Sequence, residues 1–268
     1  MTQSAISKRI AFLEDELGTK LFNRINRQVS LTDAGYNLLP KAQELINQAA
    51  DIKRYATNLS TEVAGPLSIA TSHHIGLRRL PPILRAFKTR HSEVELQIQF
   101  AESEQACDAI ARGEMELAIV TLPNSLPPEL ECKTIWFDQL YIVVGHEHEL
   151  AQQAKVGLSA LLNYPCVFPS DDTETHKIMQ RAIKGLDSEL TVQMTTNNLE
   201  TIKMLVEVGF GWSLLPQTML DKGLFVLDVG IDLSRNLGLV WHKKRSLSNA
   251  ANAMQQLIYG HALVGSNS

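Results

Sequence analysis

The stretch TQSAISKRIAFLEDELGTKLFNRINRQVSLT, residues 2–32, carries the most informative pattern in the chain. Apolar residues recur in it at intervals of four and three, which predicts one face of an amphipathic helix: Ile6, Ile10, Leu13 and Leu17. Thr2 is a residue type that begins helices, and Gly18 is one that ends them. The sequence therefore predicts a helix that starts almost at the first residue.

The residues after this helix predict a β-hairpin. Arg24 lies in the first expected strand, Asn26–Arg27 forms a polar turn, and Val29–Leu31 forms the second strand. A helix with a polar start followed by a basic hairpin is an arrangement with which proteins enter a DNA groove and contact the flanking phosphates. The periodicity alone is equally consistent with an amphipathic surface helix followed by a loop.

The pattern TQSAISKRIAFLEDELGTKLFNR-x-x-R-x-V-x-LT-x-AG-x-x-LLP-x-A closely resembles the LysR-type transcriptional regulators. The resemblance implies that the helix lies in the major groove of operator DNA and that the hairpin is a wing. It places these residues against DNA: Thr2, Gln3, Ser4, Ser7, Lys8, Arg9, Arg24 and Arg27. Family members carry two further helices before this one. We therefore expect residues 1–32 to be a partial winged helix-turn-helix, with an exposed apolar stripe and weak operator binding.

Composition and charge fit a multidomain regulator. The 268 residues suit two or three units, and the 44% hydrophobic content can form a proper core. Residues 1–32 carry a net charge of +2 and the remainder −6, as expected for a localised nucleic-acid footprint on an acidic protein. No apolar run long enough for a membrane span and no signal peptide is seen. The cysteines are few and far apart, which indicates a reduced cytoplasm: Cys107, Cys132 and Cys166.

Residues 33–64 predict a long linker helix. Apolar residues alternate there at intervals of four and three: Leu38, Ala42, Leu45, Ala49, Ile52, Ala56 and Leu59. This is the 3.5-residue repeat of a coiled coil, although a helix packed on its own domain remains the alternative. Pro40 is expected to bend the first turns or mark a late start, and Gly65-Pro66 to end the helix. The resemblance implies that this helix joins the chain into a homodimer or homotetramer.

Residues 65–268 alternate strands and helices. The first unit has expected strands at 67–70, 94–100 and 117–121 and helices at 80–90 and 104–112. A similar second unit follows, with strands at 140–144, 166–168, 190–195, 212–215 and 237–241 and helices at 159–162, 173–184, 199–208 and 249–259. Such alternation predicts α/β units with doubly wound sheets.

The segments GPLSIATS, ARGEMELAIV and VEVGFGWSLLP resemble the effector domain of LysR-type regulators, which shares its fold with periplasmic solute-binding proteins. The expected fold class is α/β, with a partial winged helix-turn-helix at 1–32, a linker helix at 33–64 and a two-lobe effector domain at 65–268. Lobe I is expected at 65–136 and 240–268, and lobe II at 137–239. The chain should cross between the lobes near 137–145 and 230–240.

Polar residues follow the expected strands at the edge where ligands of parallel sheets bind. Together with the resemblance, they imply an effector site for a small polar or anionic metabolite: Thr71, Ser72, His73, Thr121, Ser170 and Asn198. Each of these residues could instead be a simple helix N-cap. We expect no metal and no cofactor, because neither His73-His74 nor His146 with His148 has further ligands at suitable spacing and adjacent residues of an extended chain face opposite sides. His73 is expected either to donate to an anionic effector or to titrate near neutral pH.

Two other classes of protein are alternatives for this sequence. Gly209-Phe210-Gly211 only weakly resembles a dinucleotide-binding loop, since it follows a helix and precedes a strand, so no enzyme is expected. A small-solute-binding protein without a DNA role needs only the effector fold, and it is the stronger alternative.

Overall fold

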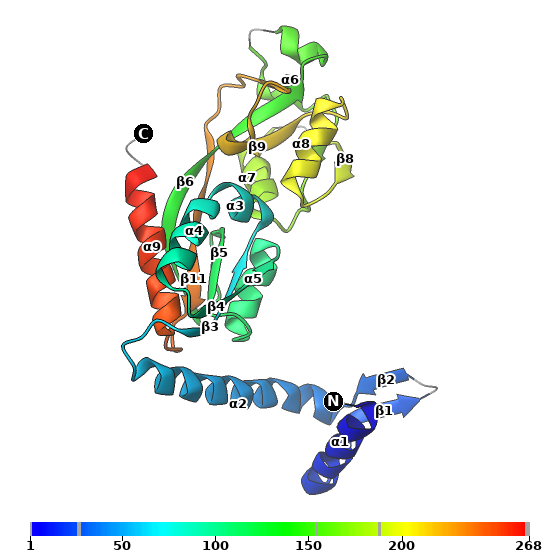
Figure 1. The fold of residues 1–268 in the computed structure, drawn as a ribbon. Coiled ribbons are helices and arrows are strands. Elements are labelled where there is room, and N and C mark those ends of the chain that lie inside the picture. The colour runs from blue at the N-terminus through cyan, green and yellow to red at the C-terminus, as the bar shows by residue number, and fades with distance from the viewer. Residues whose placement is uncertain (1, 26–27, 154, 187–188, 266–268) are drawn as a thin grey trace. The chain divides into compact units, whose positions relative to one another are not determined.

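The computed structural model describes residues 2–25, 28–153, 155–186 and 189–265, and the chain divides into two compact units, residues 1–56 and 57–268 (Figure 1). The first unit begins with helix α1 (Gln3–Leu17) and the antiparallel strands β1 (Phe22–Ile25) and β2 (Gln28–Leu31). Thr2 occupies the N-cap, and Gly18 ends α1 with a left-handed φ of 63°. The predicted helix and hairpin strands are confirmed, while the turn Asn26-Arg27 lies outside the described residues.

A buried carboxylate ties α1 to the hairpin. Glu14 is 6% exposed, and its Oε1 accepts hydrogen bonds from the backbone N–H of Leu21 at 2.8 Å and of Phe22 at 3.2 Å. Its Oε2 lies 3.1 Å from Lys20 Nζ. These contacts lower the pKa of the Glu14 carboxyl. The hydrogen bond from the Leu21 N–H has the largest effect, and the one from Lys20 the next largest. Glu14 therefore sets where the hairpin begins relative to the end of α1.

Replacing Glu14 with Gln is expected to loosen this junction, because a neutral amide is a weaker acceptor for the two backbone N–H groups than a carboxylate. Deuterium uptake at the Leu21 and Phe22 amides should rise several-fold in hydrogen exchange of the variant. Glu16→Gln removes the same charge from an exposed position of the same helix and is the matched control. Equal protection of both amides in wild type and Glu14→Gln would show that the carboxylate does not hold the hairpin.

The second helix of this unit, α2 (Asp33–Asn58), is continuous through Pro40. It ends at Asn58 and not, as the sequence suggested, at Gly65-Pro66. The reason is that Asn58 bonds to the start of the last helix: its Oδ1 accepts from the Asn249 N–H at 2.9 Å, and its Nδ2 donates to the Leu247 carbonyl at 2.9 Å. These bonds hold the chain at the point where the helix stops.

Apolar side chains are exposed along both helices. On α1, Ile6 is 45% and Leu17 47% exposed, as expected for the apolar stripe. On α2, Leu45 is 67% and Ile52 71% exposed. The 3.5-residue repeat of α2 therefore includes large apolar side chains that the first unit leaves exposed.

The second unit consists of two lobes, which we define by their hydrophobic clusters. Lobe I is built on three parallel strands, β3 (Gly65–Thr71), β4 (Val94–Phe100) and β5 (Leu117–Thr121). They lie in the order β4-β3-β5, and β11 (Leu233–His242) pairs antiparallel with β5. Helices α4 (Pro81–Arg90) and α9 (Asn249–Gly265) cover one face, and α5 (Ser103–Ala111) covers the other. In β5, Leu117 and Ile119 pack toward α4 and α9, while Ala118 and Val120 pack toward α5. This alternation confirms the predicted doubly wound sheet.

Lobe II repeats this arrangement. The second half of β6 (Leu130–Gly145) pairs with β9 (Ser213–Pro216) and β10 (Leu224–Val226), and a Cys166–Trp212 bridge adds the parallel pair β7 (Cys166–Phe168) and β8 (Val192–Thr195). Helices α7 (Glu174–Ala182) and α8 (Leu199–Glu207) pack on opposite faces of these strands. The short helices η1 (Glu149–Gln152), α6 (Leu158–Leu161) and η2 (Gln217–Met219) lie in the connections.

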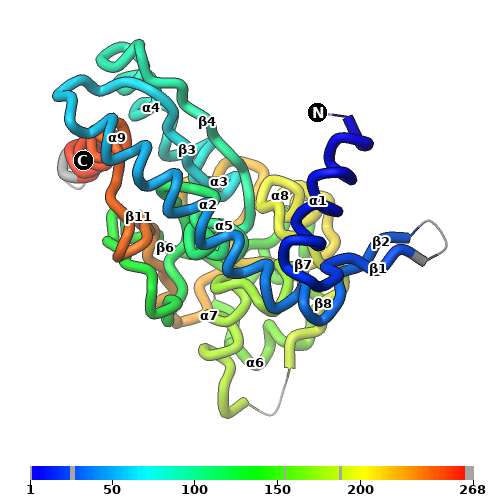
Figure 2. The backbone as a smooth tube through the Cα atoms, turned by 90° about the horizontal axis from the view of Figure 1, so that it is seen from below, coloured from blue at the N-terminus to red at the C-terminus, as the bar shows by residue number. Residues whose placement is uncertain are grey.

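Two long strands connect the lobes. β6 and β11 pair antiparallel from Leu130↔His242 to Leu140↔Leu233, and β6 then continues into lobe II (Figure 1). Figure 2 shows the two strands side by side. A Cβ on Gly238 would lie 2.3 Å from the Lys133 carbonyl oxygen, so the close approach of the two strands requires glycine there. No helix among the described residues is long and apolar enough to cross a membrane.

Candidate functional site

A small cleft of about 50 Å³, which we call the interlobe cleft, lies where β6 and β11 pass between the lobes. Lobe I contributes the residues that follow its parallel strands: Ser72, His73, His74, Glu102, Ser103, Glu104 and Thr121. Lobe II contributes residues at and before the starts of α7 and α8: Pro169, Thr173, Glu174, Thr175, Asn197 and Leu199. Arg235 of β11 completes the lining. Most of these side chains carry hydrogen-bonding groups.

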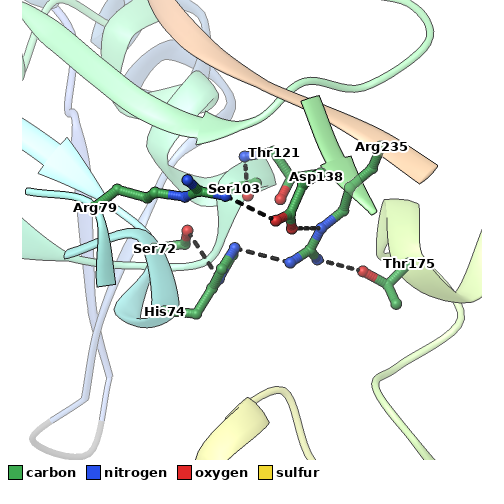
Figure 3. A network of polar contacts seen from close by, with 8 residues as sticks. All are labelled: Ser72, His74, Arg79, Ser103, Thr121, Asp138, Thr175 and Arg235. Atoms are coloured by element: carbon green, nitrogen blue, oxygen red, sulfur yellow. Dashed lines mark hydrogen bonds and ion pairs between the residues drawn. The ribbon is translucent and has the colours of Figure 1, made fainter. Parts of the chain in front are cut away.

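Arg235 connects both lobes (Figure 3). It stands opposite Asp138 of β6 in the strand register, and its Nε donates to Asp138 Oδ2 at 2.9 Å. Its Nη1 donates to Thr175 Oγ1 of α7 at 2.7 Å, and its Nη2 donates to His74 Nε2 of α3 (His73–Arg78) at 2.9 Å. The side chain is only 3% exposed. One guanidinium thus bonds lobe I, lobe II and the strand pair between them.

The charges around Arg235 leave an excess of positive charge. Arg79 Nη2 also reaches the Asp138 carboxylate, at 3.4 Å, so two guanidinium groups share one carboxylate. The pKa of His74 is held well below its usual value, mainly by burial and in addition by the positive charges of Arg235 and Arg79. His74 is therefore neutral at physiological pH and acts as a hydrogen-bonding group.

The donor and acceptor roles in the hydrogen bonds at Ser72 and Ser103 determine whether their hydroxyl protons remain available to a ligand. Because a guanidinium only donates, His74 Nε2 must accept, and the His74 proton sits on Nδ1 and points at Ser72 Oγ, 3.3 Å away. Ser103 Oγ similarly accepts the Thr121 backbone N–H at 3.2 Å. Each hydroxyl has accepted one bond and keeps its own proton to donate. Ser72 and Ser103 are thereby prepared as donors toward a ligand in the cleft.

Three of the six residues expected at the effector site line the cleft, namely Ser72, His73 and Thr121. Thr71 does not, because its hydroxyl donates across the sheet to the Ile119 carbonyl at 2.8 Å. Ser170 and Asn198 lie beside the lining. The Ser170 hydroxyl donates to Asn197 Oδ1 at 2.8 Å, and Asn198 Oδ1 accepts the Thr201 N–H at 3.0 Å as the N-cap of α8. For Asn198 the structure shows the capping role that was the alternative interpretation.

Sequence reasoning missed Arg235, Glu102, Ser103 and Glu104. A signal existed for three of them, because Glu102, Ser103 and Glu104 follow the end of β4 just as Ser72 follows β3. No comparable signal marks Arg235, whose role depends on β11 crossing between the lobes at that residue.

The histidine pairs have ordinary polar and aromatic partners. The argument that His73 and His74 face opposite sides of an extended chain was wrong, because both begin helix α3. The His73 ring stacks on Phe100 with centroids 5.1 Å apart. His146 Nε2 donates to the Lys222 carbonyl at 2.7 Å, and His148 Nδ1 accepts the Leu150 N–H at 3.2 Å. Within the described ranges, no three His, Cys, Asp or Glu side chains are grouped as metal ligands.

The residues expected to face DNA lie mostly on an accessible surface of the first unit. Five helical or pre-helical positions and one strand position are exposed: Thr2, Gln3, Ser4, Lys8, Arg9 and Arg24. Ser7 is half-buried, and Arg27 lies outside the described residues. The start of α1 therefore presents polar and basic side chains together.

Comparisons with known proteins agree with this architecture. The model described as "LysR substrate binding domain" matches residues 60–262, and "Bacterial regulatory helix-turn-helix protein, lysR family" matches residues 1–36. Over 262 residues, covering 95% of this chain and 88% of the relative, the chain is 26% identical to the uncharacterized HTH-type transcriptional regulator YwqM of Bacillus subtilis. It is 28% identical to the HTH-type transcriptional regulator CysB of Haemophilus influenzae, covering 85% of this chain and 72% of the relative.

Solved structures show the same fold. HinK, a LysR family transcriptional regulator from Pseudomonas aeruginosa, is 22% identical with a TM-score of 0.65, covering 98% of this chain and 89% of that one. The effector-binding domain of QuiR in complex with shikimate is 17% identical with a TM-score of 0.68, covering 75% of this chain and 98% of that one. Since the two family models match residues 1–36 and 60–262, the chain belongs to the LysR family of transcriptional regulators.

Proposed function

We propose that this LysR-family regulator binds its effector in the interlobe cleft and that the effector carries an anionic group. The observation that supports this most is the convergence of hydrogen-bond donors: the free hydroxyl protons of Ser72 and Ser103 beside the Arg235 guanidinium. Ionised acceptors form the strongest bonds with such donors. A small cleft with a few converging polar groups is also typical of ligand sites.

The same contacts suggest how binding changes the protein. Arg235 bonds to His74 of lobe I and to Thr175 of lobe II, so the relative position of the lobes determines whether all of these bonds form together. An effector that accepts from Ser72 and Ser103 binds best to one arrangement of the lobes. Binding then shifts the population toward that arrangement and biases the DNA-binding heads of the oligomer.

The remaining parts of the chain take the other roles of a regulator. We propose that residues 1–32 bind operator DNA through Thr2, Gln3, Ser4, Ser7, Lys8, Arg9, Arg24 and Arg27, that the linker at 33–64 joins protomers, and that residues 65–268 sense the effector in the cytoplasm. A solute-binding protein without a DNA role is not favoured, because residues 1–36 match the helix-turn-helix model. The relatives are transcriptional regulators rather than enzymes.

Replacing Ser72 with Ala tests the site. Calorimetric titration of the full chain with a panel of small carboxylates, comprising 2-hydroxy acids, dicarboxylates and amino acids, identifies the carboxylates that bind. Losing one hydrogen bond to a charged group should weaken the best binder about 10- to 100-fold in Ser72→Ala. Ser159→Ala removes an exposed hydroxyl from α6 and should leave binding unchanged. If Ser72→Ala binds that carboxylate as wild type does, the effector lies elsewhere.

A further inference from the structure

The interlobe cleft contains two carboxylates that an anionic ligand would not use. Glu102 and Glu104, on either side of the donor Ser103 at the start of α5, both line the cleft and are half-buried. Glu102 occupies the N-cap of α5, but its side chain accepts no capping hydrogen bond. The third lining carboxylate, Glu174, forms an ion pair with Arg181 at 2.5 Å. Among the described residues, no side-chain ion pair of this kind neutralises Glu102 or Glu104.

Burial disfavours the ionised forms of the Glu102 and Glu104 carboxyls. The pKa of Glu102 is raised mainly by burial and secondly by the charge of Glu104. The nearby His73 lowers it, but by less. Burial also raises the pKa of Glu104, and the charge of Asp172 adds to this, while hydrogen bonds from the backbone N–H groups of Glu104 itself and of Glu174 act in the opposite direction. Lys177 also partly offsets the increase, although its ammonium donates to the Asp172 carbonyl. The two carboxyls therefore lie in partly desolvated positions, where a cationic group would stabilise their ionised forms.

The spacing of the donors and the carboxylates limits what can fill the cleft. Glu102, Ser103 and Glu104 are consecutive residues with Cα atoms about 4 Å apart, so one short stretch of chain brings the donor hydroxyl and both carboxyls to the same cleft. The cleft itself measures about 50 Å³. A ligand that satisfies both must be small and must carry its opposite charges only a few bonds apart.

We propose, building on the effector role of this cleft, that its ligand is a small zwitterion of the α-amino acid type. The ligand carboxylate accepts hydrogen bonds from the Ser72 and Ser103 hydroxyls on the side of Arg235. The ligand ammonium lies against the carboxylates of Glu102 and Glu104. Ser103 thus recognises the acid group, and its two sequence neighbours select the amino group next to it.

Matched pairs of ligands test this proposal. L-alanine and L-lactate, L-serine and L-glycerate, and L-aspartate and L-malate differ only by an ammonium in place of a hydroxyl. In calorimetric titrations of the full chain at pH 7, the amino acid of at least one pair should bind about tenfold or more tightly than its hydroxy acid, because the ammonium interacts with two partly desolvated carboxylates.

The double variant Glu102→Gln/Glu104→Gln should bring the affinity for that amino acid down to that for its hydroxy acid, while the hydroxy acid binds as well as before or better. Glu93→Gln/Glu95→Gln removes the same charge from two exposed acids at the start of β4, and as the charge-matched control it should preserve the difference. Unchanged circular dichroism and melting temperature show that the variants remain folded.

Each other outcome overturns the zwitterion assignment. Equal or tighter binding of the hydroxy acids would leave the cleft as an anion site without an ammonium subsite. Binding of ethylammonium that is unaffected by Ser72→Ala would identify a cation site instead. Binding of neither member of any pair would also contradict the assignment, and the carboxylate panel with Ser72→Ala would then decide separately whether the cleft binds an anionic effector.

Discussion

Replacing Asp138 with Ala is expected to lower the free energy of unfolding of residues 57–268 by about 3–5 kcal/mol, the cost of leaving one partner of a buried ion pair alone. Asp138 is 2% exposed and is the only carboxylate that pairs with Arg235 among the described residues. Without it, the Arg235 guanidinium stays buried beside a second guanidinium, that of Arg79. Urea unfolding followed by circular dichroism measures the loss.

Two comparison variants separate this mechanism from a general effect of mutation. Arg79→Gln should cost less than about 1 kcal/mol, because Arg79 is 29% exposed and lies 3.4 Å from the carboxylate, and Asp138 keeps Arg235. Replacing both members of the buried pair, as Asp138→Leu/Arg235→Met, should recover most of the lost stability, because no buried charge is left alone. Similar losses for Asp138→Ala and Arg79→Gln would contradict the role assigned to the pair. Effector affinity should stay low in the double variant, since the connection between His74 and Thr175 is lost.

Local sequence signals were sufficient for most of the secondary structure. The strands at 94–100 and 117–121 have the predicted bounds, and every residue of β5 is buried, as its continuous apolar run indicated. The end of α1 at Gly18 followed from a glycine with the left-handed conformation that few other residues adopt. These features depend on residues that are close together in the chain, so one stretch of sequence contains the whole signal.

Features that depend on distant pairing were not predictable in this way. The first half of β6 has mostly exposed side chains and becomes a strand because β11 pairs with it. Arg235 bonds to Asp138, Thr175 and His74, which lie 97, 60 and 161 residues away in the sequence. The rule that ligands bind after parallel strands located Ser72 and Thr121, since that rule needs only the strand order. It could not locate a residue on an antiparallel crossing strand.

The double substitution Leu45→Asp/Ile52→Asp in α2 is expected to convert the oligomer into monomers of 29.8 kDa. Both side chains are more than half exposed and lie on the 3.5-residue repeat, so we expect a partner helix to cover them. Burying an aliphatic side chain of this size contributes about 1.5–3 kcal/mol, and the substitution removes four such side chains from a dimer while placing like charges in its seam. Sedimentation equilibrium gives the mass directly.

Gln43→Asp is the control, because it adds a charge to the same helix on the side away from the repeat and should leave the mass unchanged. An oligomer that persists in Leu45→Asp/Ile52→Asp would show that α2 packs on its own protomer and that other surfaces hold the subunits together.

Loss of the dimer should also lower the affinity for operator DNA. A monomer presents one α1, and it loses the gain in affinity that two linked half-site contacts provide. Operator affinity should therefore fall together with the mass, while carboxylate binding in the interlobe cleft, whose lining residues all lie in 72–235, should persist.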